Sequence, residues 1–188
     1  TVCRVASEKR ILKSVEIYTK SGIFTAEADS FADCTGDGEL FYLAGCEYQL
    51  GRPEDGLCQP MTTCFRMGNV DMELFGQERE HIQTLYRQYQ AEGKIKNPRE
   101  NILVFFGLGE GVIHFNTTRI LRHDPTDAFS LSRAEVEGRR QVYEMVDFLR
   151  KHFRAFAKSA LLSIACEIGV RESRKLKGVH VLTAQELL

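Results

Sequence analysis

The first 35 residues alternate apolar and polar side chains with the period of two that β-strands show. Two alternating runs flank Lys20-Ser21-Gly22, and this arrangement predicts a β-hairpin. We expect its second strand to end at residues 33–36, and a short helix to follow over residues 40–44, closed by Gly45. The apolar members of the two runs are Ile11, Val15, Ile17, Phe24, Ala26 and Ala28.

Helical periodicity dominates two later segments. Residues 73–92 and residues 132–154 both carry apolar side chains three and four positions apart among charged ones. Ser132, with Glu135 three positions later, predicts a capping box at the start of the second helix. We expect the apolar stripe of that helix to fill a core; it consists of Val142, Met145, Val146, Leu149 and Phe153.

Short apolar runs separated by turn residues predict the remaining strands. They lie at residues 62–70, 102–106, 111–115 and 179–182, whereas residues 160–170 fit either a helix or a strand. This mixture predicts an α/β (α+β mixed) fold, in which an antiparallel or mixed sheet is flanked by helices.

The composition fits a folded chain without a strongly charged partner. The 188 residues are 43% hydrophobic and carry 25 basic and 26 acidic side chains, so nothing attracts nucleic acid or anionic lipid in general. The apolar stretches fall short of the roughly 20 residues that a membrane helix needs. The six cysteines form no Cys-x-x-Cys pair, which argues against a zinc site. We expect reduced thiols, mostly buried, in a cytoplasmic protein.

The segment Thr35-Gly36-Asp37-Gly38 carries the clearest candidate chemistry. A strand that turns into a helix here would leave backbone N–H groups unpaired, and glycines would let a ligand approach them. Asp37 would repel a bare phosphate but could accept a hydrogen bond from a ligand hydroxyl. The local pattern fits equally an Asp37 that only caps the helix.

This segment belongs to a series of motifs that runs along nearly the whole chain. Two of them are specific together: Thr35-Gly36-Asp37-Gly38 and Gly169-Val170-Arg171-Glu172-Ser173-Arg174. In this order they resemble the FAD-dependent oxidoreductase family of bacterial flavoproteins, with Cys34 where alanine is usual. The resemblance implies FAD as cofactor, Thr35–Gly38 beside it, and hydride or electron transfer with a small organic substrate. Other matching segments are Gly51-Arg52, Gln59-Pro60-Met61-Thr62, Asn116-Thr117-Thr118-Arg119, Asp124-Pro125-Thr126 and Gly138-Arg139.

Two segments that the resemblance implies have no counterpart. The family's N-terminal Gly-x-Gly-x-x-Gly unit, which holds the FAD pyrophosphate, is not matched, and neither is the C-terminal segment that covers the flavin. We therefore expect an internal fragment that does not retain FAD alone and whose partner is the remainder of the parent flavoprotein. Residues 1–50 would be part of the FAD domain, and residues 51–188 a substrate-domain-like segment.

Three further side chains are candidates for catalysis. Arg171 and Arg174 could offer fixed positive charge to a substrate carboxylate or to the flavin, and the resemblance favours this role. An internal ion pair, for example with Glu172, is the alternative. His114, on an alternating segment, could donate a proton or could be a satisfied, half-buried strand residue.

The functional hypotheses fall into two main classes. The resemblance favours an oxidoreductase parent, whereas the missing phosphate loop favours a non-catalytic interaction or assembly domain for the isolated chain. A hydrolase or transferase that uses Asp37 and His114 has little support, because no nucleophile–base pair is visible.

Overall fold

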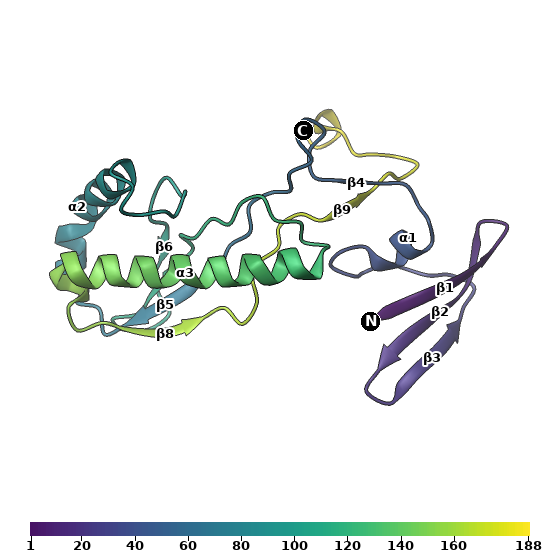
Figure 1. Cartoon of the computed structure of the whole chain (residues 1–188), viewed down its shortest axis with the longest axis horizontal. Coiled ribbons are helices and arrows are strands. Elements are labelled where there is room, and N and C mark those ends of the chain that lie inside the picture. The colour runs from purple at the N-terminus through teal and green to yellow at the C-terminus, as the bar shows by residue number, and fades with distance from the viewer. The chain divides into compact units, whose positions relative to one another are not determined.

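The computed structural model describes all 188 residues and contains three antiparallel sheets and three α-helices, which confirms the mixed α/β fold (Figure 1). The chain divides into two compact units, the first formed by Thr1–Cys58 with Glu172–Leu188 and the second by Gln59–Arg171. This division differs from a single boundary at residue 50, because strand β9 (Arg174–Leu176) pairs with β4 (Tyr48–Leu50) and returns the C-terminal segment to the first unit. The assignment of these parts to an FAD domain and a substrate domain stays a prediction.

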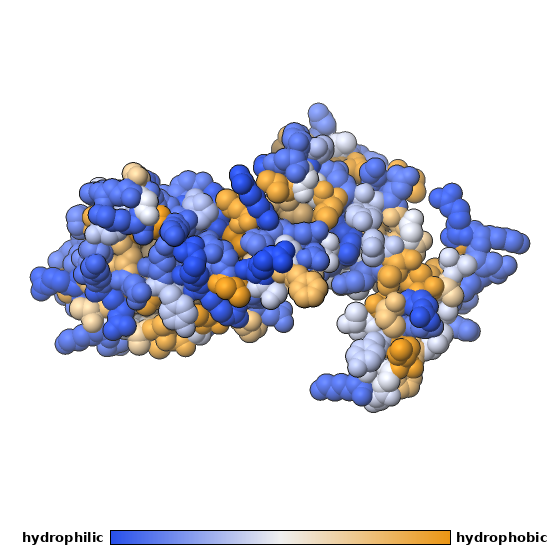
Figure 2. All heavy atoms as spheres, in the orientation of Figure 1, coloured by the Kyte–Doolittle hydropathy of each residue, from blue (hydrophilic) through white to orange (hydrophobic).

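The first unit begins with a three-stranded antiparallel sheet. Its strands follow one another as β1 (Val2–Glu8), β2 (Ile11–Thr19) and β3 (Gly22–Glu27). Thr19 pairs with Gly22 across the turn, which confirms the predicted hairpin. Most side chains of this sheet are exposed, and several apolar ones give it orange patches in Figure 2.

One expected strand of the first unit is shorter than predicted, and another does not form. Strand β3 ends at Glu27 rather than near residue 36, and residues 179–182 are an exposed irregular segment. In both places no neighbouring strand of this chain supplies the hydrogen-bond ladder that a strand requires. The short helix is confirmed as α1 (Glu39–Leu43), and Gly45 follows it with a positive φ of 75°.

The second unit is built on a four-stranded antiparallel sheet in the order β6-β7-β5-β8. Residues 160–170 supply a strand here, not a helix. The buried side chains of β5 and β7 form one core with those of α2 and α3, and Figure 1 shows α3 running along the sheet. The elements are β5 (Phe65–Gly68), α2 (Met72–Ala91), β6 (Val104–Phe105), β7 (Ile113–Phe115), α3 (Ala128–His152) and β8 (Ala160–Ile164).

Helix α3 begins four residues before the predicted start. The side chain of Asp127 caps it by accepting a hydrogen bond from Ser130 N at 2.6 Å, so Ser132 lies inside the helix and is exposed. Glu135 does not complete a capping box; its carboxylate accepts a hydrogen bond from Ile168 N at 2.7 Å and pairs with Arg139. The apolar stripe predicted for this helix is confirmed, because all five of its side chains are buried.

The cysteines correct another expectation. All six are free, but Cys3, Cys34, Cys46 and Cys166 are exposed, so most are not buried as predicted. They lie on the exposed sheet, at turns or beyond the end of a strand, where the local apolar neighbours do not reach the core. None of the helices combines the length and the apolar character needed to cross a membrane.

Candidate functional site

The two motifs that are specific together meet in the first unit. The Ser173 hydroxyl donates a hydrogen bond to the carbonyl oxygen of Gly36 at 3.3 Å, and Arg174 Nη1 donates one to the carbonyl oxygen of Asp37 at 2.9 Å. The pairing of β9 with β4 delivers Ser173 and Arg174 to this position. Residues 137 positions apart in the chain thus form one polar site beside the Thr35–Gly38 turn.

The turn is organised from within by Asp33. Its carboxylate accepts hydrogen bonds from the backbone N and hydroxyl of Thr35, at 2.9 and 2.6 Å, and from Phe41 N at 3.0 Å. Thr35 Oγ1 in turn accepts a hydrogen bond from Glu39 N at 2.9 Å. The N–H groups at the helix start, expected to be unpaired, are therefore largely bound by Asp33 and Thr35.

The position that caps α1 is occupied by Gly38, not by Asp37. Gly38 has a φ of 64°, a left-handed conformation that favours glycine, and an added Cβ would overlap the ring of Phe41. The side chain of Asp37 makes no cap and is half-buried. Of the two roles that the sequence left open for Asp37, the structure removes the capping role.

The hydrogen bonds to Asp33 also set its charge. Partial burial raises the pKa of this carboxyl, but hydrogen bonds from the Thr35 hydroxyl and from backbone N–H groups more than offset burial, so the pKa lies below its ordinary value. Asp33 is consequently ionised at neutral pH and acts as a fixed acceptor at the centre of the turn.

Arg174 lies against aromatic rings instead of a carboxylate. Its guanidinium carbon is 4.1 Å from the ring centroid of Tyr42 and 6.0 Å from that of Tyr48. Glu172 pairs with Lys175 at 2.6 Å. Sequence reasoning missed both tyrosines, because only the fold brings them beside Arg174; the β4–β9 pairing does so for Tyr48.

Arg171 belongs to the second unit, where it lines a cavity of about 150 Å³. Its Nη2 donates a hydrogen bond to Thr62 Oγ1 at 3.3 Å. Two arginines that sequence reasoning did not select, Arg99 and Arg119, line the same cavity. We refer to this space, lined by Gln59, Pro60, Thr62, Arg99, Arg119 and Arg171, as the arginine cavity.

A second cavity of about 430 Å³ shares Arg119 with the arginine cavity. Its polar lining is mainly basic, and its one carboxylate, Glu137, is bound by Arg140 and Gln141. The pKa of Glu137 is lowered, first by the hydrogen bond from Arg140. The charged and polar side chains in the lining are Lys96, Arg119, His123, Arg133, Glu137 and Gln141.

His114 lies on β7, opposite Arg66 of β5, and lines neither cavity. It is half-buried, and its Nδ1 has no hydrogen-bond partner within the protein. Burial, with a smaller contribution from the charge of Arg66, lowers the pKa of this imidazole below its ordinary value. Its role as a proton donor stays a prediction.

Comparison with known families identifies the chain as a whole. The family model described as "FAD dependent oxidoreductase" matches residues 1–188, which include the joined motifs of the first unit and the arginine cavity of the second. Comparisons with curated proteins and with solved structures found no match. The match over its full length shows that this chain belongs to the FAD-dependent oxidoreductase family.

Proposed function

We propose that the chain supplies part of the flavin site and the substrate-facing part of an oxidoreductase that acts on a small organic molecule. The observation that carries this proposal is the pair of hydrogen bonds from Ser173 and Arg174 to the carbonyl oxygens of Gly36 and Asp37. These contacts join the two most specific family motifs into one polar site.

The residues of this site suit the hydroxyl-bearing part of FAD. An added Cβ at Gly36 would meet nothing within 4 Å, so a ligand can approach the backbone there closely. The half-buried carboxylate of Asp37 can accept a hydrogen bond from a ligand hydroxyl. The chain offers no Gly-x-Gly-x-x-Gly loop between a strand and a helix, so in this proposal the parent protein holds the pyrophosphate with other residues.

When bound, FAD supplies the ability to accept or donate hydride or electrons. In this proposal, the residues of this chain bind and orient the cofactor and the substrate. Arg174 fixes the turn through Asp37 and places a permanent positive charge beside it, while Tyr42 and Tyr48 hold the guanidinium in position. Arg171 would act in the second unit, on the substrate side.

The exposed side chains of the three-stranded sheet favour a polypeptide partner for this chain, which we propose to be the remainder of the parent protein. Ile11, Tyr18, Ile23 and Phe24 are all more than half exposed. Exposed apolar side chains in this number on one small sheet are typical of a surface that another polypeptide covers. The six free cysteines favour the reducing cytoplasm as the compartment.

The same exposed sheet supports the alternative, a non-catalytic interaction or assembly domain with an oxidoreductase-derived fold. Titration of the 188-residue chain with FAD, followed by the flavin absorption spectrum, separates the two functions. Saturable binding with a shifted spectrum contradicts the non-catalytic alternative.

Variants assign any FAD binding to the proposed site. Arg174→Gln and Asp37→Asn are each expected to weaken it about tenfold or more, because each removes a charge-assisted hydrogen bond. Lys13→Gln is the control, since Lys13 is an exposed side chain on β2 of the same unit, and it should leave the affinity unchanged. Equal affinities for FAD in all three variants would contradict the proposal that FAD binds beside the Thr35–Gly38 turn.

A further inference from the structure

Three guanidinium groups, and no carboxylate, line the arginine cavity. Arg99, Arg119 and Arg171 come from three separate segments of the chain, and Thr62 adds a buried hydroxyl. We infer that the arginine cavity binds the carboxylate group of a small organic anion.

Two of the arginines have hydrogen-bond donors that the protein leaves without acceptors. The Nε atoms of Arg99 and Arg119 are fully buried and have no partner within the chain. Such donors are costly to bury, and native proteins seldom leave them unmatched. A carboxylate supplies two oxygens that accept from guanidinium groups in a paired, planar arrangement.

The backbone of Arg119 is fixed before any ligand arrives. Arg119 N donates to Gln141 Oε1 at 2.8 Å, and Gln141 Nε2 donates to the carbonyl oxygen of Arg119 at 3.0 Å. Gln141 itself is buried on α3. Ile120, which follows Arg119 in the chain, forms a β-bridge with Met61.

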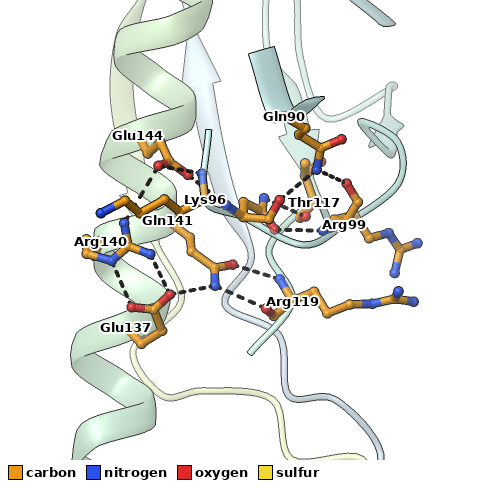
Figure 3. Close-up of polar contacts among 10 residues, drawn as sticks. Gln90, Lys96, Arg99, Thr117, Arg119, Glu137, Arg140, Gln141 and Glu144 are labelled. Atoms are coloured by element: carbon orange, nitrogen blue, oxygen red, sulfur yellow. Dashed lines mark hydrogen bonds and ion pairs between the residues drawn. The ribbon is translucent and has the colours of Figure 1, made fainter. Parts of the chain in front are cut away.

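Arg99 is held by a second set of polar groups, which are buried or half-buried. Its carbonyl oxygen accepts hydrogen bonds from the Tyr86 hydroxyl at 2.9 Å and from Gln90 Nε2 at 2.7 Å, and its N donates to Asn97 Oδ1 at 3.1 Å. Burial raises the pKa of Tyr86, so its hydroxyl stays a donor. Figure 3 shows the side chains of Arg99 and Arg119 extending to the same side, away from the helix that carries Gln141. Anchored arginines that point one way form a preorganised anion site.

The surroundings add positive charge. The adjoining cavity brings Lys96 and Arg133, while its one carboxylate, Glu137, is already bound by Arg140. Glu100 pairs with Arg119, but its side chain is 70% exposed, so solvent screens this pair and a ligand can compete with it.

The size and chemistry of the arginine cavity favour a carboxylate over a phosphate. Its volume of about 150 Å³ corresponds to about five water molecules at ~30 Å³ each, which suits a small acid. Phosphate sites commonly use a helix N-terminus or a glycine-rich loop of N–H donors. No glycine lines this cavity, and Pro60 has no N–H to offer.

Identifying the anion as the substrate of the oxidoreductase rests on the proposed function, whereas the binding of the anion does not. In that role, Arg99, Arg119 and Arg171 would hold the carboxylate of the small organic substrate. They would thereby fix the orientation of the carbon that exchanges hydride.

Isothermal titration calorimetry of the full 188-residue chain with malonate, at constant ionic strength, tests the inference. We expect saturable binding of malonate and none of the neutral isostere malonamide. Arg99→Gln and Arg119→Gln should each weaken malonate binding about 10- to 100-fold, because each removes charge-assisted hydrogen bonds. Arg87→Gln removes one exposed positive charge from α2 of the same unit and should bind as the original chain does.

A variant with the opposite expected effect separates recognition from misfolding. Glu100→Gln removes the internal competitor for Arg119 and should strengthen malonate binding, which a folding defect would not do. The inference is overturned if the chain does not bind malonate, or if the two arginine variants bind it as tightly as Arg87→Gln. It is equally overturned if inorganic phosphate binds more tightly than malonate. Since no flavin is present, arginine-dependent malonate binding would survive a failure of the chain to bind FAD.

Discussion

At the scale of single residues, Asp33 determines the shape of the turn on which the flavin proposal depends. One carboxylate binds both donors of Thr35 and the backbone N of Phe41. Asp33→Ala is expected to lower the free energy of unfolding by about 1 kcal/mol, as the loss of a helix cap does. Urea denaturation measures this difference, and Asp29→Ala, at an exposed position of the same unit, should change it by less than about 0.5 kcal/mol.

The stabilisation by Asp33 depends on pH in a defined direction. Because its pKa is lower in the folded protein than the ordinary value of 3.8, the stabilisation is present above that value and is lost as the pH falls through the folded pKa. The difference between the original chain and Asp33→Ala should therefore shrink in acid. A difference that stays constant down to the acid limit would contradict this role.

The imidazole of His114 is expected to titrate below its ordinary pKa of 6.5, because burial and then Arg66 disfavour its charged form. Folding stability should accordingly decrease as the pH falls below 6.5, where the unfolded chain binds the proton first. Nuclear magnetic resonance titration of the ring protons measures the pKa, and His114→Gln identifies the signal. A midpoint at or above 6.5 would contradict the expectation.

Sequence patterns selected some residues of the two candidate sites and missed others for a physical reason. Thr35, Gly36, Asp37 and Arg174 stand inside motifs, and the structure brings them together. Arg99 and Arg119 stand in irregular segments without helical or strand periodicity. Arg119 also ends the matching segment Asn116-Thr117-Thr118-Arg119, but that match alone did not assign it to a site. The backbones of both arginines are held by the side-chain amides of Gln141, Gln90 and Asn97. The partners of these amides are 7 to 22 residues away, or two residues away in a turn.

At the scale of elements, helix α3 approaches the segment that precedes β5 so closely that only a glycine fits. A Cβ at Gly138 would overlap the hydroxyl of Thr63, which is fully buried. Gly138→Ala is expected to lower the free energy of unfolding by about 1–3 kcal/mol through overpacking. Gly76→Ala, at an exposed position of α2 with nothing near the added Cβ, should raise it by about 0.5–1 kcal/mol. Urea denaturation measures the free energy of unfolding of both variants. Equal changes in Gly138→Ala and Gly76→Ala would contradict close packing at Gly138.

The elements that sequence periodicity predicted well are those stabilised by their own amphipathic pattern. Helices α2 and α3 and the β2–β3 hairpin belong to this class. Residues 28–35 and 179–182 have strand-like composition but no partner strand, and β9 forms because β4 lies beside it. Strand formation depends on distant partners, which a local pattern does not contain.

At the scale of the whole molecule, the return of the chain after Arg171 creates the candidate flavin site. Residues 172–188 rejoin the first unit through the β4–β9 pair, and Ser173 and Arg174 contact the Thr35–Gly38 turn only for this reason. The order of the family motifs identified the family, while their meeting in space required the fold.

The flavin content of the purified full-length protein tests the central claim most directly. We expect a yellow protein whose extracted chromophore is FAD, and a preparation of Arg174→Gln with lower FAD occupancy than one of Lys13→Gln. A colourless protein that cannot be reconstituted with FAD would contradict the claim that the Thr35–Gly38 turn and Arg174 serve a flavin.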